Sequence, residues 1–205
     1  AEEQDGLLTL TQIRRAIPAR HRQRKLVTDG WIRRIAPATY KISGSPDTHR
    51  QRLRAGLLTL GRQSWVSYEA AASLHRLDRS DPTAVEFTVP RGRSIGSVPF
   101  TVHTTERLAA IDLVAVDGLR CLSATRTIID LASLGIAQIL LGAAIDSAVR
   151  MRLSAPLVIN TRLGELRGPG RRGVRLLDGL LLDAGGETEL ERRFLALIRR
   201  VRLPR

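Results

Sequence analysis

The strongest constraint on the fold lies near the N-terminus, where two short helical patterns follow each other closely. Thr9 and Gln12 have the spacing of a capping box, which predicts the start of a helix. Pro18 predicts the end of that helix, because proline breaks the hydrogen-bond ladder. A second helix is expected from about 19 to 29, since Gly30 is placed to end it in a left-handed cap. This arrangement predicts a helix-turn-helix.

Two β-branched or aromatic runs come next and predict a hairpin. The runs 31–35 and 39–42 flank the short turn Ala36-Pro37-Ala38. We interpret this hairpin as a β-wing. Residues 1–43 are therefore expected to form a winged helix-turn-helix domain.

Positive charge is concentrated on this motif. Between Arg14 and Arg34 the sequence holds eight Lys or Arg residues and one acid, Asp29, a local net charge of +7. Such a cluster is typical of phosphate binding, and the second helix of this motif enters the major groove of DNA. The candidate DNA-binding residues are Arg20, His21, Arg22, Gln23, Arg24, Lys25, Arg33 and Arg34. Gln23 falls where an apolar residue is expected, so it either reads a base or is half-buried.

The charge of the whole chain is weaker support for DNA binding. The net charge is +13, but only two of the 33 basic residues are lysines, Lys25 and Lys41. This bias is typical of a high-GC bacterial genome, which enriches arginine everywhere. A solvated basic face that binds an acidic protein is the simpler alternative reading of the cluster.

A second domain is expected over residues 47–183, after the linker 43–47. Strand patterns precede most of the helical patterns, which predicts an α+β fold. Helices are expected at 48–60, 68–77, 124–134, 137–149, 155–166 and 173–182, and strands at 84–89, 98–102, 111–116 and 118–122. Ser67 and Ser123 are expected to cap the helices that follow them.

The sequence predicts no catalytic, metal or cofactor site. Cys121, the single cysteine, lies in an apolar run and is expected to be a buried structural thiol. The four histidines lack metal-ligand spacing. The chain carries no membrane-spanning apolar run, and its cysteine usage fits a reducing cytoplasm. The arginines at 167, 171, 172 and 175 form either a second phosphate contact or a solvated face.

Several motifs in a fixed order resemble one family. After the winged motif come Ser-Tyr-Glu-Ala-Ala-Ala-Ser-Leu-His-Arg-Leu at 67–77, Val-Glu-Phe-Thr-Val-Pro-Arg-Gly-Arg at 85–93, Asp-Gly-Leu-Arg at 117–120 and Ala-Thr-Arg-Thr-Ile-Ile-Asp-Leu-Ala at 124–132. The order resembles the actinobacterial branch of the AbiEi-type antitoxins of type IV toxin–antitoxin systems. The resemblance covers about residues 6–183.

The resemblance implies a non-enzymatic transcriptional autorepressor. Such antitoxins bind inverted repeats of double-stranded DNA in their own promoter through the winged domain. Their second domain, a mixed α/β antitoxin domain, is implicated in cooperative operator binding and in opposing a nucleotidyltransferase-like toxin.

Residues 184–205 predict an amphipathic helix. In many relatives a similar segment opens a very-short-patch-repair-like nuclease domain, in which Glu191 would match an acidic residue. The alternative function is therefore the DNA-binding regulatory portion of such an endonuclease. The strands that carry the remaining metal ligands are absent here, so no catalysis is expected. We favour the simpler interpretation, in which Glu187, Glu189 and Glu191 are acids placed in the first turn of a helix.

Overall fold

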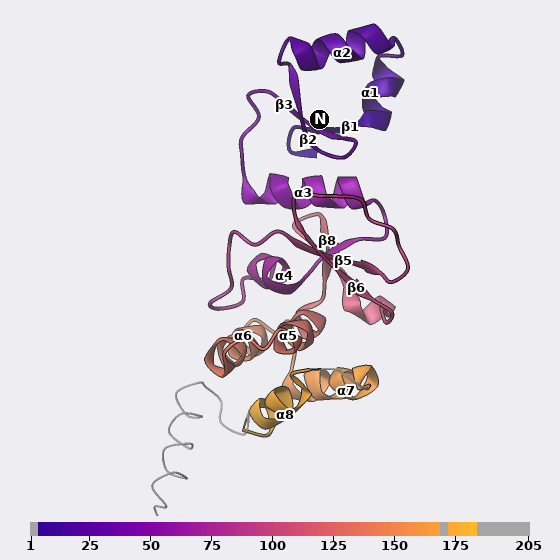
Figure 1. The fold of residues 1–205 in the computed structure, drawn as a ribbon. Coiled ribbons are helices and arrows are strands. Elements are labelled where there is room, and N and C mark those ends of the chain that lie inside the picture. The colour runs from indigo at the N-terminus through magenta and orange to yellow at the C-terminus, as the bar shows by residue number, and fades with distance from the viewer. Residues whose placement is uncertain (1–3, 169–171, 184–205) are drawn as a thin grey trace, which may run out of the picture.

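The computed structural model describes residues 4–168 and 172–183, which form a mixed α+β fold with two sheets (Figure 1). The N-terminal unit, residues 4–42, contains β1 (Leu7–Thr9), α1 (Leu10–Ala16), α2 (Arg20–Thr28), β2 (Ile32–Ala36) and β3 (Thr39–Ile42). Its three strands form an antiparallel sheet in the order β1-β3-β2. The strand β1 was not expected, because a three-residue strand is too short to show an alternating pattern.

The predicted helix ends are confirmed. The Thr9 hydroxyl accepts a hydrogen bond from the Gln12 N–H at 3.2 Å, and the Gln12 side chain accepts one from the Thr9 N–H at 2.8 Å. Gly30 has a φ of 75°, and the following N–H, of Trp31, donates to the carbonyl of Leu26 at 2.9 Å. These contacts pair backbone groups that helix ends otherwise leave unpaired.

The rest of the described chain is built on a five-stranded mixed sheet in the order β6-β5-β4-β8-β7. Its strands are β4 (Trp65–Val66), β5 (Glu86–Pro90), β6 (Thr101–Thr105), β7 (Leu113–Val116) and β8 (Leu119–Leu122). Its helices are α3 (His49–Leu60), α4 (Tyr68–Leu74), α5 (Ala124–Ser133), α6 (Gln138–Arg150), α7 (Pro156–Leu166) and α8 (Val174–Asp183). The helix predicted at 184–205 lies outside the described residues.

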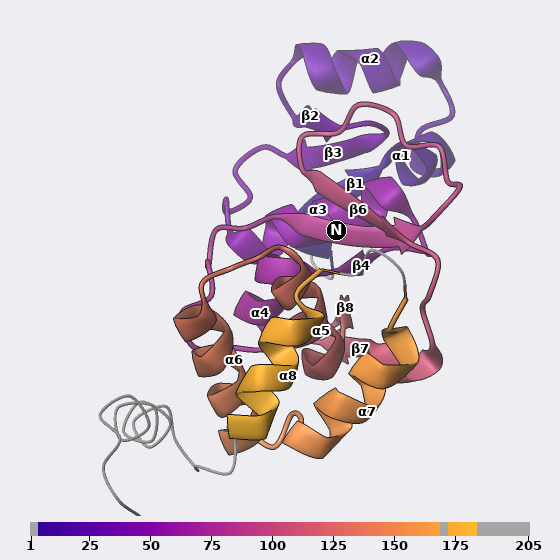
Figure 2. The same ribbon diagram turned by 60° about the horizontal axis from the view of Figure 1, so that its bottom comes forward.

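Figure 2 shows α5 among the other helices of this half, and it packs against α4, α6, α7 and α8.

One of the two serine caps predicted in this half is confirmed and the other is wrong. Ser123 caps α5 as predicted, because its hydroxyl accepts from the Arg126 N–H at 3.3 Å. The prediction for Ser67 is wrong: its side chain makes no capping hydrogen bond to α4, and its Oγ is buried without a partner. The two-residue strand β4 was not predicted, and it joins β5 to β8 in the centre of the sheet.

Helix α3 lies between the two sheets (Figure 1). Toward the N-terminal unit, Arg54 pairs with Asp5 at 2.5 Å and Thr59 shares a hydrogen bond with Thr39 at 2.8 Å. Toward the second sheet, Leu53 and other apolar side chains of α3 are buried against Phe87. One helix therefore completes the packing of both sheets.

Gly56 allows α3 to approach the second sheet closely. A Cβ atom at this position would overlap the Phe87 ring, which is fully buried. We expect Gly56→Ala to destabilise the protein by about 1–3 kcal/mol, the usual cost of overpacking a core. Gly164→Ala is the matched control, because a Cβ there meets open space in α7 and alanine favours a helix. Urea unfolding should show opposite signs for the two variants. Equal effects would contradict the close approach.

A buried ionic group links α5 to the segment before β7 and to α7. We call it the Arg126 cluster, comprising Asp112, Arg126, Asp130 and Arg162. Arg126, only 2% exposed, donates from Nε to both carboxylate oxygens of Asp130 at 2.9 and 3.0 Å. Its Nη1 donates to Asp112 at 3.3 Å, and Arg162 binds Asp112 through two donors at 2.9 and 2.5 Å. These charges are buried but paired, as burial of charge requires.

The Arg126 cluster predicts a loss of stability in acid. Burial by itself would raise the pKa of Asp112, but hydrogen bonds from Arg162 and Ala109 and the charge of Arg126 hold this pKa below its ordinary value of 3.8. A lowered folded-state pKa stabilises the fold above the unfolded value, and this contribution is lost as the pH falls through the folded-state pKa. We expect the free energy of unfolding, measured by urea titration, to fall below about pH 4. Asp112→Asn should remove part of that dependence, and an unchanged pH profile would contradict the assignment.

Candidate nucleic-acid interface

The basic residues of α1, α2 and β2 are exposed. Seven of the eight candidate residues are exposed, and only Gln23 is half-buried. The six basic candidates with permanent charge share this exposure with two further arginines of α1, Arg14 and Arg15. Within residues 4–168 and 172–183, none of these eight cations forms an ion pair with an acid. Their charges are therefore available to a polyanion.

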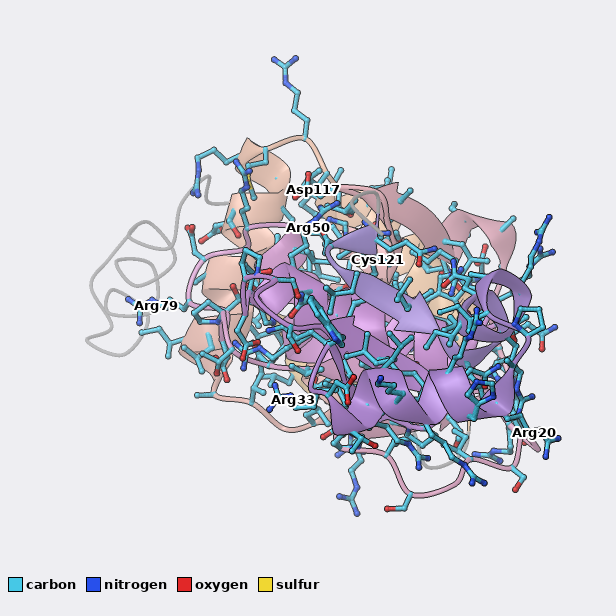
Figure 3. The ribbon with its side chains drawn as sticks, turned by 90° about the horizontal axis from the view of Figure 1, so that it is seen from above. Arg20, Arg33, Arg50, Arg79, Asp117 and Cys121 are labelled. Atoms are coloured by element: carbon cyan, nitrogen blue, oxygen red, sulfur yellow. The ribbon has the colours of Figure 1, made fainter. Side chains whose placement is uncertain are left out.

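The geometry of α2 divides its residues between two faces. Arg20, Gln23, Arg24 and Val27 recur at helical spacing and line a cavity of about 280 Å³ between α1, α2 and the first sheet. His21, Arg22 and Lys25 are absent from that lining and lie on the other sides of the helix. Figure 3, viewed from above, shows Arg20 at one end of α2 and Arg33 toward the other. Cations therefore lie near both ends of α2 and on more than one of its sides.

The face of α2 toward α1 and the first sheet is only partly buried. Leu26 is half-buried, Val27 is 44% exposed, and no residue of α2 is fully buried. Val27 faces the cavity between α2, α1 and the first sheet, and this cavity leaves its side chain partly open to solvent.

Gln23 has a partner within the unit. Its Nε2 donates to the carbonyl of Ile17 at 2.6 Å, so the side chain ties α2 to the last residue before Pro18. That carbonyl stands at the end of α1, where helix carbonyls lack partners of their own. The sequence left open whether Gln23 reads a base or is half-buried, and in the structure it is half-buried.

The second group of arginines lies at the opposite end of the molecule, at α7 and α8 (Figure 1). Arg167 pairs with Asp178 at 2.6 Å, and Arg172 and Arg175 are exposed. Arg171 falls outside the described residues. The cations of α2 and those of α7 and α8 therefore lie on different parts of the molecule.

Cys121 is a structural residue, as predicted. It is fully buried in β8, and burial raises the pKa of its thiol far above the ordinary value. His75 packs beside it and shares a hydrogen bond with the carbonyl of Leu122 at 2.7 Å. Burial lowers the pKa of His75, which favours the neutral ring. A thiol held in its protonated form is a poor nucleophile.

The described residues contain neither a metal-binding group of side chains nor a membrane-spanning helix. Among residues 4–168 and 172–183, no three His, Cys, Asp or Glu side chains are grouped as a metal site would require. In the same part of the chain, no helix has both the length and the apolar character needed to cross a membrane.

Comparisons with known proteins show that solved structures share this fold. No protein-family model matches the chain, and no curated protein matches its sequence. The crystal structure of the RV2827C protein from Mycobacterium tuberculosis is similar, with a TM-score of 0.65 at 16% sequence identity. The similarity covers 91% of this chain and 74% of that one. At this identity the likeness concerns the fold alone.

Proposed function

We propose that the chain is a sequence-specific DNA-binding transcriptional repressor. Residues 4–42 act as a winged helix-turn-helix, in which α2 is the reading helix and the β2–β3 hairpin is the wing. The observation that carries this proposal is the set of eight exposed cations on α1, α2 and β2 that have no acidic partner among the described residues.

The proposed mechanism separates the roles of these side chains. Arg22 and Lys25 on the outer face of α2 contact phosphates or base edges in the major groove, where arginine binds guanine through two hydrogen bonds. Arg33 and Arg34 of β2 contact the phosphate backbone beside the groove. Each neutralised phosphate releases counterions, so affinity depends strongly on salt.

The resemblance in sequence motifs extends the proposal to a biological role. The protein acts in the cytoplasm as the antitoxin of a type IV toxin–antitoxin system and opposes a nucleotidyltransferase-like toxin. It binds inverted repeats in its own promoter, and two copies are required because each half-site presents the same groove surface.

A mobility-shift titration on the upstream promoter tests the DNA-binding part directly. We expect binding to the promoter to be tighter than binding to scrambled DNA of equal length, with the logarithm of the association constant falling linearly with the logarithm of salt concentration. Equal affinity for both DNAs would contradict sequence-specific repression. Absence of binding at low salt would contradict DNA binding altogether.

A further inference from the structure

One face of the second sheet is polar where a core face would be apolar. Phe87 and Val89 of β5 are buried on the side that packs toward α3. Because side chains alternate along a strand, Thr88 lies on the opposite side. The parallel register places Thr88 beside His103 of β6, whose ring stacks on Tyr68 with 3.8 Å between centroids. This polar face lies under α4 and α5.

Two buried polar atoms on this face have no hydrogen-bond partner. Thr88 is 2% exposed, and its Oγ1 makes no hydrogen bond among the described residues. Nε2 of His103 is also unpaired, since the nearest acidic oxygen, Oε1 of Glu86, lies at 3.9 Å, beyond hydrogen-bond distance. Buried polar groups in folded proteins are normally paired, so an unpaired one on a residue that lines a cavity is a candidate contact for a ligand.

Thr88 is one of the residues that line a cavity of about 270 Å³ between the sheet, α4 and α5. The buried guanidinium of Arg126 and the exposed Arg172 line the same cavity, together with Asp130. Arg126 is already balanced by Asp130 and Asp112. The uncompensated positive charge at this cavity is therefore that of Arg172, which has no acidic partner among the described residues. That charge favours an anionic ligand.

We propose that this cavity binds a small phosphate monoester no larger than a sugar phosphate. Its volume lies just below the roughly 300–1,000 Å³ of ordinary small-molecule pockets, which limits the size of the ligand. The Thr88 hydroxyl donates to a phosphate oxygen. Nη2 of Arg126, which donates one N–H to Thr105 at 3.3 Å, supplies its second N–H. Arg172 supplies charge at the rim, as arginine commonly does for phosphate.

Calorimetric titration of the full chain with ribose 5-phosphate and, separately, inorganic phosphate tests the proposal. Ribose at the same ionic strength is the uncharged comparison. We expect saturable binding of ribose 5-phosphate and none of ribose. If inorganic phosphate binds equally well, the site still stands, and its ligand is the free anion rather than the ester.

Matched variants separate this cavity from general effects of charge and burial. Thr88→Val and Arg172→Gln should each raise the dissociation constant about tenfold, the effect of losing one charge-assisted hydrogen bond. Thr127→Val is the control for the first, because its Oγ1 is equally buried and unpaired but does not line the cavity. Arg175→Gln, which removes an exposed charge of α8 outside the cavity, is the control for the second.

Folding is monitored independently in every variant by its melting temperature without ligand. Thr88→Val should melt at or above the parent temperature, because valine keeps the shape and removes an unpaired hydroxyl. No saturable heat with either phosphate at millimolar concentration would overturn the proposal. Equal losses in Thr88→Val and Thr127→Val would also overturn it. None of these measurements depends on DNA binding. A negative result here would therefore leave the repressor proposal unaffected.

Discussion

Replacing both Arg22 and Lys25 by alanine is expected to weaken binding to promoter DNA by at least about tenfold at fixed salt. Both side chains are exposed on α2, away from the cavity that α2 forms with α1. Removing two phosphate-binding charges should also make the slope of log affinity against log salt shallower by about two. A mobility-shift titration at several salt concentrations measures both quantities.

A control at the opposite end of the molecule removes the same formal charge. Arg150→Ala with Arg175→Ala lowers the net charge by two on α6 and α8, far from α2 (Figure 1). If the general positive field alone attracted DNA, this control would weaken binding as much as the α2 variant does. We expect it to retain nearly parental affinity. A parental affinity of the α2 variant would refute the assignment of α2 as the reading helix.

Arg126→Met is expected to lower the free energy of unfolding by about 3–5 kcal/mol, the usual cost of removing one partner from a buried ion pair. Arg126 is buried, and its loss removes the N–H that both carboxylate oxygens of Asp130 share and one of the two arginines that pair with Asp112. Urea unfolding followed by circular dichroism measures this change.

A surface control and a double variant distinguish the loss of buried charge from the loss of packing in Arg126→Met. Arg150→Ala breaks the exposed pair with Asp78 and should cost less than about 1 kcal/mol, as surface pairs do. The double variant Arg126→Met with Asp130→Leu should recover part of the loss, because it removes both buried charges of that pair. If the double variant lost as much unfolding free energy as Arg126→Met and Asp130→Leu lose together, the effect would come from packing and not from charge.

Long helices with apolar periodicity and clear end signals could be predicted from the sequence. Ser123, Gly135 and the pattern between them predicted α5 within one residue, and α6 and α7 were also close. The short strands β1 and β4 could not be predicted, because two or three residues show no alternation. Their pairing depends on strands distant in the chain.

The sequence predicted which residues form the candidate interface. It did not predict how their side chains are arranged on the surface. The sequence placed the cations on one helix and one strand. It did not show that the spacing of Arg20, Gln23 and Arg24 directs them toward α1, or that Gln23 binds the Ile17 carbonyl. These facts depend on how α2 sits over the first sheet.

The Arg126 cluster carried a partial signal in the sequence. Arg126 and Asp130 are the charged residues of α5 and stand four residues apart, the spacing of a helical ion pair. Arg162 joins them through Asp112 from fifty positions away in the chain, and no local pattern indicates this contact.

The position of α3 bears on how the protein unfolds. Arg54 and Gln51 bind Asp5 of the N-terminal unit, while Leu53 belongs to the core of the second sheet. Melting of α3 would remove the support of both sheets at once. The linker after β3 therefore separates two domains in the sequence, but we do not expect these domains to unfold independently. The described chain is expected to lose its structure in one cooperative transition, and excision of residues 1–43 would leave a polar helix face bare.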